Sequence, residues 1–189
     1  MKQGGVYRQN KGMSMLLIRD GDAKSALSDE LREMVAGLAH ARELVFDEVE
    51  LARTDVPPCI GCFQCMTKHR GRCINHRALE GLIQKTLGRR FVVYLSPALF
   101  GTFSAIIKNV VDHGGLIIGK RGTCVQIAIG YGDDLTDEEA STFIDIPGRH
   151  MGQADIVHPM LRGNRFEAFV SRCAADTGRV RAAMEGMLS

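Results

Sequence analysis

Four of the six cysteines lie close together in one segment of the chain. Cys59, Cys62 and Cys65 follow one another with the spacing C-x2-C-x2-C, and Cys73 comes shortly after them. Three thiolates at this spacing can surround one centre, and a fourth can close the site. Iron–sulfur cubes are bound in this way, because the thiolates must reach separate irons of a small cluster. The segment therefore predicts a metal site whose ligands are Cys59, Cys62, Cys65 and Cys73, holding a [4Fe-4S] cluster.

Two other interpretations of these cysteines stay open. Structural zinc sites usually pair two C-x2-C units across a longer spacer, so the overlapping triplet matches zinc less well. The cysteines can also be small apolar side chains in a loop that has lost its metal. Cys124 and Cys173 stand apart from the cluster, on an expected strand and an expected helix face, and both are predicted to be core residues.

Composition limits the class of protein. The chain has 189 residues, of which 45% are hydrophobic and 24% charged, as in ordinary globular proteins. A net charge of +2 without a basic stripe argues against nucleic acid as a partner. The start of the chain has no signal-peptide pattern and no apolar run is long enough for a membrane span, so we expect a cytoplasmic protein that does not bind membranes. Thiols stay reduced there, which favours metal or redox chemistry for the clustered cysteines.

Strand and helix patterns alternate along the chain. The expected strands are short apolar runs, several of them continuous as in strands covered on both faces: Met15–Arg19, Glu43–Leu51, Phe91–Ser96, Cys124–Gly130 and Ala154–Met160. Helical spacing of apolar residues predicts helices between them. One begins at Thr136, where Thr136 and Glu139 match a capping box, and the last runs from about Arg165 to the end.

This alternation predicts an α/β fold with a doubly wound parallel sheet of five strands in the order 2-1-3-4-5. The chain is expected to form a single domain over residues 1–189, with residues 1–12 as a flexible N-terminal segment. Ligands bind such sheets beyond the carboxyl ends of the strands, at the switch in strand order. The loops Asp20–Ser25, Ser96–Ser104 and Gly130–Leu135 are therefore the candidate ligand-binding segments.

The cysteine segment and the stretch Ser96-Pro97-Ala98-Leu99-Phe100-Gly101-Thr102-Phe103-Ser104-Ala105 together resemble the NADPH-dependent FMN reductase superfamily, which has a flavodoxin-like fold. The cysteine spacing is similar to that of the iron–sulfur flavoproteins within it. The resemblance implies that FMN binds to the residues Lys24, Ser25, Ser96, Pro97, Ala98, Leu99, Phe100, Gly101, Thr102, Phe103, Gly130, Tyr131 and Gly132. In this interpretation Gly101 lets the backbone approach the ligand closely, and Tyr131 can stack on the flavin.

The first loop departs from the family pattern. A helix N-terminus follows it, and Lys24, Ser25 and Ser28 can contact a phosphate there. Asp20 and Asp22, however, bring negative charge to the place where the resemblance puts the phosphate dianion.

The sequence thus predicts an FMN-dependent redox protein of the iron–sulfur flavoprotein type, with no catalytic acid or base of its own. Electrons would pass between a donor such as NAD(P)H and a partner protein or small-molecule acceptor. The resemblance also implies a homodimer or homotetramer. Two alternatives remain: an NAD(P)H-dependent FMN or quinone reductase without a cluster, and a non-enzymatic flavodoxin-like domain with a zinc site.

Overall fold

The computed structural model describes the chain in seven stretches, residues 13–65, 67–69, 72–76, 79–86, 88–113, 124–152 and 165–188. The expected strand Ala154–Met160 and the expected flexible segment 1–12 lie outside these residues. Within them, no helix is long and apolar enough to cross a membrane.

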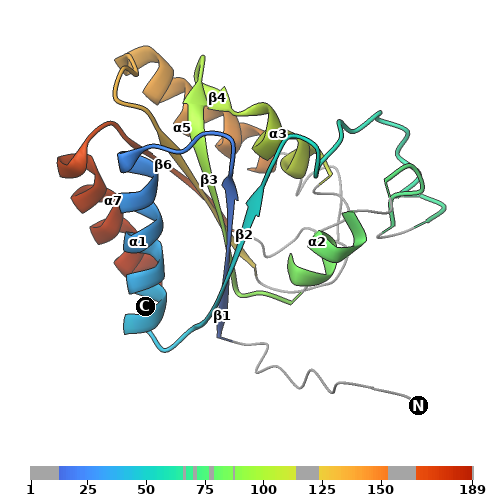
Figure 1. The fold of residues 1–189 in the computed structure, drawn as a ribbon, viewed down its shortest axis with the longest axis horizontal. Coiled ribbons are helices and arrows are strands. Elements are labelled where there is room, and N and C mark those ends of the chain that lie inside the picture. Colours follow the sequence, from blue (N-terminus) through green and yellow to red (C-terminus); the bar gives the residue numbers. More distant parts are fainter. Residues whose placement is uncertain are drawn as a thin grey trace.

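A parallel β-sheet forms the centre of the molecule (Figure 1). Its order is β2-β1-β3-β5-β6, and each neighbouring pair along this path is parallel. The strands span Ser14–Asp20 (β1), Val45–Leu51 (β2), Phe91–Leu99 (β3), Val125–Tyr131 (β5) and Arg165–Ser171 (β6). The order differs from the predicted 2-1-3-4-5 because a further strand, β4 (Thr102–Phe103), turns back antiparallel along the end of β3 and lies off the path.

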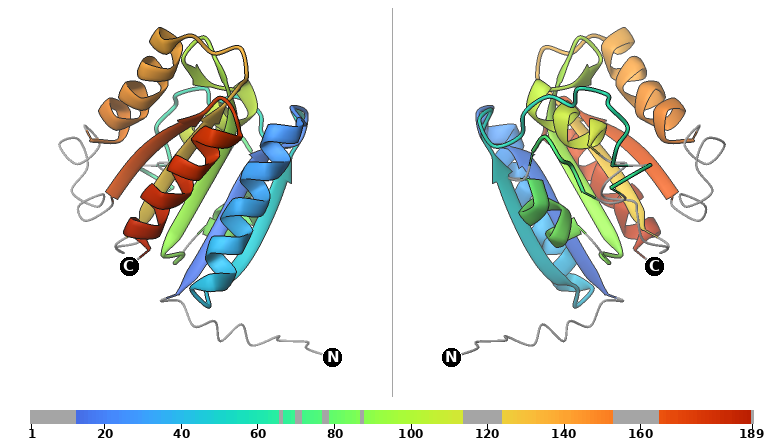
Figure 2. Two further views of the ribbon diagram at one scale, coloured as in Figure 1. Left: turned by 90° about the vertical axis from the view of Figure 1, so that its left-hand side faces the viewer. Right: turned by 90° about the vertical axis from the view of Figure 1, so that its right-hand side faces the viewer.

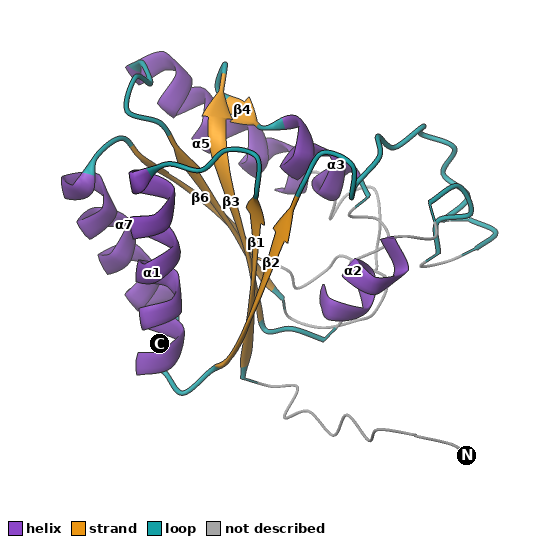
Figure 3. Cartoon of the chain, in the orientation of Figure 1, coloured by secondary structure: helices purple, strands orange, loops and turns teal. Residues whose placement is uncertain are grey.

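Helices cover both faces of this sheet (Figure 2). On one face lie α1 (Ala26–Ala41) and α7 (Ala174–Met187). On the other lie α2 (Leu79–Thr86), α3 (Ala105–Asp112) and α5 (Asp137–Gly152). Figure 3 shows the resulting layers of helix, sheet and helix, with the long loop after β2 at one side. The structure therefore confirms the predicted α/β class.

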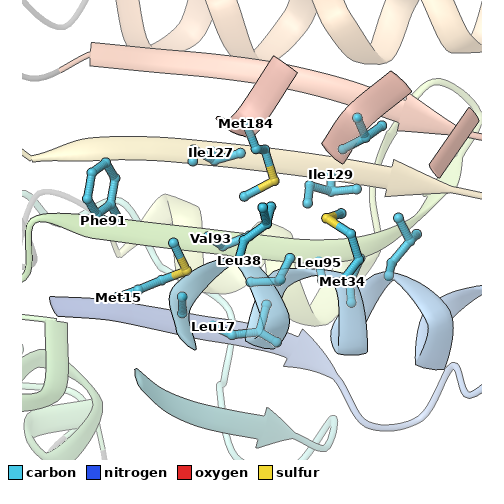
Figure 4. Close-up of a cluster of buried hydrophobic side chains, with 14 of the residues drawn as sticks. Met15, Leu17, Met34, Leu38, Phe91, Val93, Leu95, Ile127, Ile129 and Met184 are labelled. Carbon is cyan, nitrogen blue, oxygen red and sulfur yellow. The ribbon is translucent and has the colours of Figure 1, made fainter. Parts of the chain in front are cut away.

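Two apolar cores hold the layers together. In β1, Met15 and Leu17 face α1 and α7, whereas Leu16 and Ile18 face the opposite helices, and all four side chains are buried completely. This explains why the strand reads as a continuous apolar run. Figure 4 shows the first core, where side chains of β1, β3 and β5 meet those of α1 and α7. Each fully buried side chain of this kind contributes roughly 1.5–3 kcal/mol.

The end of the chain folds differently from the prediction. Arg165–Ser171 is strand β6, where a helix was expected, and α7 begins only at Ala174. In β6, Phe166, Ala168 and Val170 pack on one core and Phe169 on the other, so the segment has the alternation of a strand. Pairing with β5 along its whole length overrides the helical spacing. Cys173, expected in the core, is exposed at the start of α7.

The predicted loop Ser96–Ser104 is mostly a tight β-hairpin. Strand β3 continues to Leu99, and Phe100 and Gly101 form the turn with φ angles of 51° and 72°. Two positive φ values are typical of a type I′ turn, which matches the twist of the strands. Phe103 belongs to β4 and not to the following helix, which Ser104 caps by accepting a hydrogen bond from the N–H of Ile107.

Gly101 serves the fold, where the sequence suggested close approach to a ligand. A Cβ at this position would lie 2.7 Å from Thr142 Cβ and 3.2 Å from the Glu139 carbonyl of α5. We therefore expect Gly101→Ala to lower the free energy of unfolding by about 1–3 kcal/mol, through this clash and the left-handed backbone. Denaturant unfolding measures the change. Gly178→Ala is the matched control, because nothing lies within 4 Å of its Cβ, and this change in α7 should stabilise the protein by about 0.5–1 kcal/mol. A neutral Gly101→Ala would contradict the packing.

Candidate functional site

A pocket of about 550 Å³ opens at the carboxyl ends of the parallel strands. It lies where the strand order switches between β1 and β3, the usual ligand site of such sheets. Four segments line it, each following or ending a strand, and their residues are Ala23, Lys24, Ser25, Ala26, Leu27, Glu30, Pro97, Ala98, Leu99, Tyr131, Gly132, Asp133, Asp134, Arg172, Cys173 and Ala174.

The loop after β1 forms one side of the pocket and is held by its own hydrogen bonds. The carboxylate of Asp20 is buried, and its Oδ1 accepts the N–H of Asp22 at 2.9 Å and that of Ala23 at 3.1 Å. The N–H of Gly21 donates to the Leu51 carbonyl at 2.8 Å. Three consecutive N–H groups of this loop are therefore already bonded within the protein.

The start of α1 is capped in the same self-contained way. Ser25 and Ser28 form a capping box, in which each hydroxyl accepts the backbone N–H of the other residue. Ser28 is buried and does not line the pocket. The ammonium group of Lys24 lies 2.8 Å from Glu50 Oε1, and this hydrogen bond holds the pKa of Glu50 below its usual value. Glu50 is thus charged at neutral pH.

The end of β3 forms the opposite wall. Pro97, Ala98 and Leu99 line the pocket, and Leu99 is 48% exposed at its rim. Ser96 lies beneath them, fully buried, with its hydroxyl bonded to the Pro97 carbonyl and to the N–H of Ser104. Ser96 therefore fixes the hairpin and does not itself line the pocket.

Tyr131 joins two walls of the pocket. It is the last residue of β5, and its side chain, which the resemblance suggested could stack on a flavin, is 5% exposed. Its hydroxyl donates to the Ala23 carbonyl at 2.6 Å. Burial raises the pKa of Tyr131 to about 12, and the negative charge of Asp20 adds to the rise. The phenol therefore ties the first loop to the sheet, and most of its ring is covered.

The loop after β6 contributes residues that the sequence analysis missed. Arg172, Cys173 and Ala174 line the pocket because β6 ends there, whereas the prediction placed them inside a helix. Asp176 positions this loop by accepting the N–H of Arg172 at 3.0 Å, which lowers the pKa of the Asp176 carboxyl. The strand alternation of β6 is the signal that could have identified these residues, since the residues after each parallel strand face the ligand site.

Charges in the pocket nearly balance. Lys24 and Arg172 are basic, whereas Glu30, Asp133 and Asp134 are acidic. The two basic side chains are already ion-paired, Lys24 with Glu50 and Arg172 with Asp137.

Several residues of the predicted FMN set lie away from the pocket. Gly101 packs against α5, and the exposed Phe100 lies at the hairpin tip. Gly130 faces the ring of Phe143, which would lie 2.9 Å from an added Cβ. The structure thus brings seven of the thirteen predicted residues together, Lys24, Ser25, Pro97, Ala98, Leu99, Tyr131 and Gly132, and places six outside the lining, Ser96, Phe100, Gly101, Thr102, Phe103 and Gly130. Contact of these thirteen residues with FMN stays a prediction.

The four clustered cysteines line a second, much smaller cavity of about 30 Å³ on the loop after β2. All four thiols are free. The Asn75 amide donates to Cys62 Sγ at 3.5 Å, and burial, together with Cys59, Cys73 and Cys62, raises the pKa of Cys65. Among the described residues, however, no group of three or more His, Cys, Asp or Glu side chains is arranged to hold a metal ion.

Two histidines complete this cavity. His76 and His113 stack with ring centroids 5.6 Å apart, and both line it. His113 is 4% exposed, and its two ring nitrogens are buried without a hydrogen-bond partner among the described residues, as is Nε2 of His76. Buried polar atoms usually have a partner, and the part of the chain that the structure describes supplies none for these three nitrogens.

The sheet order, the two helical layers and the pocket beyond the strand ends define a flavodoxin-like fold. An NAD(P)H:quinone oxidoreductase from Methanothermobacter marburgensis shares it with a TM-score of 0.62 at 9% identity, over 94% of this chain and 98% of that one. An NADH:FMN oxidoreductase, in its apo form, shares it with a TM-score of 0.53 at 9% identity, over 93% of this chain and 88% of that one.

A rubredoxin oxygen:oxidoreductase from Desulfovibrio gigas is similar with a TM-score of 0.51 at 9% identity, over 93% of this chain but only 36% of that one. No protein-family model matches the sequence, and neither does any curated protein. At these identities the likeness establishes the fold, and function must be argued from the site.

Proposed function

We propose that the chain is an NAD(P)H-dependent oxidoreductase that binds a flavin in the pocket of about 550 Å³ and passes electrons to a quinone or a second flavin. The observation that carries this proposal is the position of the pocket, at the carboxyl ends of β1, β3, β5 and β6 on a fold shared with two NAD(P)H- or NADH-dependent oxidoreductases. This is the alternative without a cluster that the sequence left open.

The residues present fit the ring system and ribityl chain of a flavin. Pockets for cofactors typically measure about 300–1,000 Å³ and combine apolar walls with a few polar groups. Here the small side chains of Ala23, Pro97 and Ala98 leave room for a planar ring, and Leu99 adds an apolar rim. The phosphate end fits less well, because the Asp20 carboxylate already holds the N–H groups of the first loop.

The roles of the side chains follow from this arrangement. When bound, the flavin supplies the hydride and electron chemistry between nicotinamide and acceptor. Pro97 and Ala98 form one wall, and the buried Ser96 holds this wall in place through the hydrogen bonds of its hydroxyl to the Pro97 carbonyl and the Ser104 N–H. Tyr131 holds the first loop at a fixed distance from β5 through its bond to Ala23. The apolar rim at Leu99 would exclude water from the face that meets the acceptor.

A steady-state assay tests this function. With catalytic amounts of the chain, oxidation of NADPH or NADH by a soluble quinone should depend on added flavin. Turnover that does not depend on added flavin, or no turnover with either nicotinamide, would contradict the proposed function.

The cysteine cavity supports a second candidate function, an iron–sulfur flavoprotein. Its four thiols and the C-x2-C-x2-C spacing supply the donor set of a cubane cluster. The cavity is small, since about 30 Å³ holds a metal ion or two waters, so the exposed loop would have to widen around a cube. The zinc site, the third interpretation of the sequence, uses the same donors. In the cluster form, the electron acceptor would be a redox partner protein.

Metal analysis of protein prepared without oxygen decides among these forms. A single cube should give about four irons per chain, and Cys62→Ser should abolish the iron without unfolding the domain. The control is Cys173→Ser, a thiol that lines the other pocket. Stoichiometric zinc would support the zinc site. A chain free of metal would support the reductase that has no cluster.

Self-association is part of the proposal. The apolar side chains Ile60, Phe63 and Ile74 are 67%, 65% and 45% exposed around the cysteine cavity, and a second copy of the chain would cover them. Sedimentation should therefore give a dimer or tetramer. A monomer of 20.7 kDa at micromolar concentration, with flavin bound, would contradict it.

A further inference from the structure

We propose that the pocket recognises the ring and ribityl chain of a flavin and gains little from its phosphate, so that riboflavin and FMN bind with similar affinity. The inference rests on the proposed flavin site and names its ligand class more closely. It follows from the way the chain satisfies its own hydrogen-bond donors at the place where a phosphate would sit.

The loop after β1 bonds two of its N–H groups to one of its own carboxylates. A phosphate bound at the switch point of such a sheet normally receives several backbone N–H groups. In this chain a carboxylate takes that role, because Asp20 Oδ1 accepts from Asp22 and Ala23 at 2.9 and 3.1 Å. Asp20 is only 5% exposed, so it is built into the loop and cannot swing aside freely. The protein therefore carries its own anion in this position.

The start of α1 also bonds part of its polar groups internally. The capping box of Ser25 and Ser28 uses both hydroxyls and both N–H groups. The N–H groups of the first two helical residues, Ala26 and Leu27, have no acceptor within the helix, and both residues line the pocket. The N–H of the third helical residue, Ser28, is not free for a phosphate, because the Ser25 hydroxyl accepts it at 3.1 Å.

The charged side chains of the pocket do not favour a phosphate. Lys24 and Arg172 are the basic side chains of the lining, and each is already paired with a carboxylate, Glu50 and Asp137 respectively. The lining also contains three acidic side chains, Glu30, Asp133 and Asp134. A phosphate dianion would have to compete with these carboxylates for the two cations, whereas an uncharged ribityl chain would not.

The experiment compares the two flavins on the native chain, by titration followed through flavin fluorescence. We expect dissociation constants that agree within about threefold, since a phosphate without dedicated donors adds little affinity. FMN binding more than about tenfold tighter than riboflavin would overturn the inference while leaving the flavin site intact. If neither flavin binds, the proposed function fails and the inference falls with it.

A single substitution identifies the residue responsible. Asp20→Asn keeps an oxygen that can accept the N–H groups of Asp22 and Ala23 but removes the charge. It should tighten FMN about fivefold and leave riboflavin unchanged, because only FMN carries the charge that Asp20 repels. The matched control is Asp55→Asn, whose carboxylate also accepts a backbone N–H, that of Ala52, outside the pocket. Equal effects on both flavins would contradict the assignment. Should Asp20→Asn fail to fold, the ratio for the native chain decides alone.

Discussion

Replacing Ala26 with tryptophan should abolish flavin binding while the protein stays folded. Ala26 is the first residue of α1, exposed, and part of the pocket lining. An indole there would occupy space that the flavin needs, without disturbing either core. We expect the affinity to fall by about a hundredfold or more, equivalent to roughly 2.7 kcal/mol of binding free energy. Titration with riboflavin measures the loss.

Ala41→Trp is the control for this substitution. Ala41 is the last residue of the same helix and is also exposed, but it lies at the opposite end from the pocket. It should bind flavin like the native chain. Equal loss in both variants would trace the effect to the helix, and normal binding by Ala26→Trp would mean that the flavin site lies elsewhere.

The largest loss of stability is expected from Phe143→Ala. Phe143 is fully buried in α5, its ring meets that of Phe103 edge-on with centroids 5.1 Å apart, and Gly130 of β5 lies against it. The ring thus joins α5, the β3–β4 hairpin and β5 behind the pocket. Removing it should cost about 3–5 kcal/mol, a large part of the stability of a domain of this size. Denaturant unfolding measures the cost.

Ile144→Ala tests whether this cost is specific. Ile144 is the next residue of α5 and is 46% exposed. Its truncation should change stability by no more than about 0.5 kcal/mol. Phe143→Leu, which refills part of the space, should recover a portion of the loss. Similar losses for Phe143→Ala and Ile144→Ala would contradict the packing described for α5.

The parts of the fold that the sequence predicted are those in which local pattern and tertiary role agree. The central strands β1 and β3 are continuous apolar runs because helices cover both of their faces. The capping box at Thr136 was also confirmed, with Glu139 Oε2 accepting the N–H of Thr136 at 3.0 Å. Such signals depend on neighbours in the sequence, so they can be recognised without the structure.

The parts that failed depend on contacts between distant segments. The segment Arg165–Ser171 has helical spacing but pairs with β5, and that pairing brought Arg172 and Cys173 to the pocket. The sequence indicated that Asp20 brings negative charge to the expected position of a phosphate. It could not show that the same carboxylate bonds to Asp22 and Ala23, because this depends on the shape of the loop.

We propose that this chain binds flavin at the carboxyl ends of its strands. The most direct measurement is an anaerobic titration of the native chain with riboflavin and FMN, followed by addition of NADPH or NADH. We expect one flavin bound per chain, loss of its oxidised absorption on addition of the nicotinamide, and loss of binding in Ala26→Trp. No binding of either flavin at millimolar concentration would contradict it.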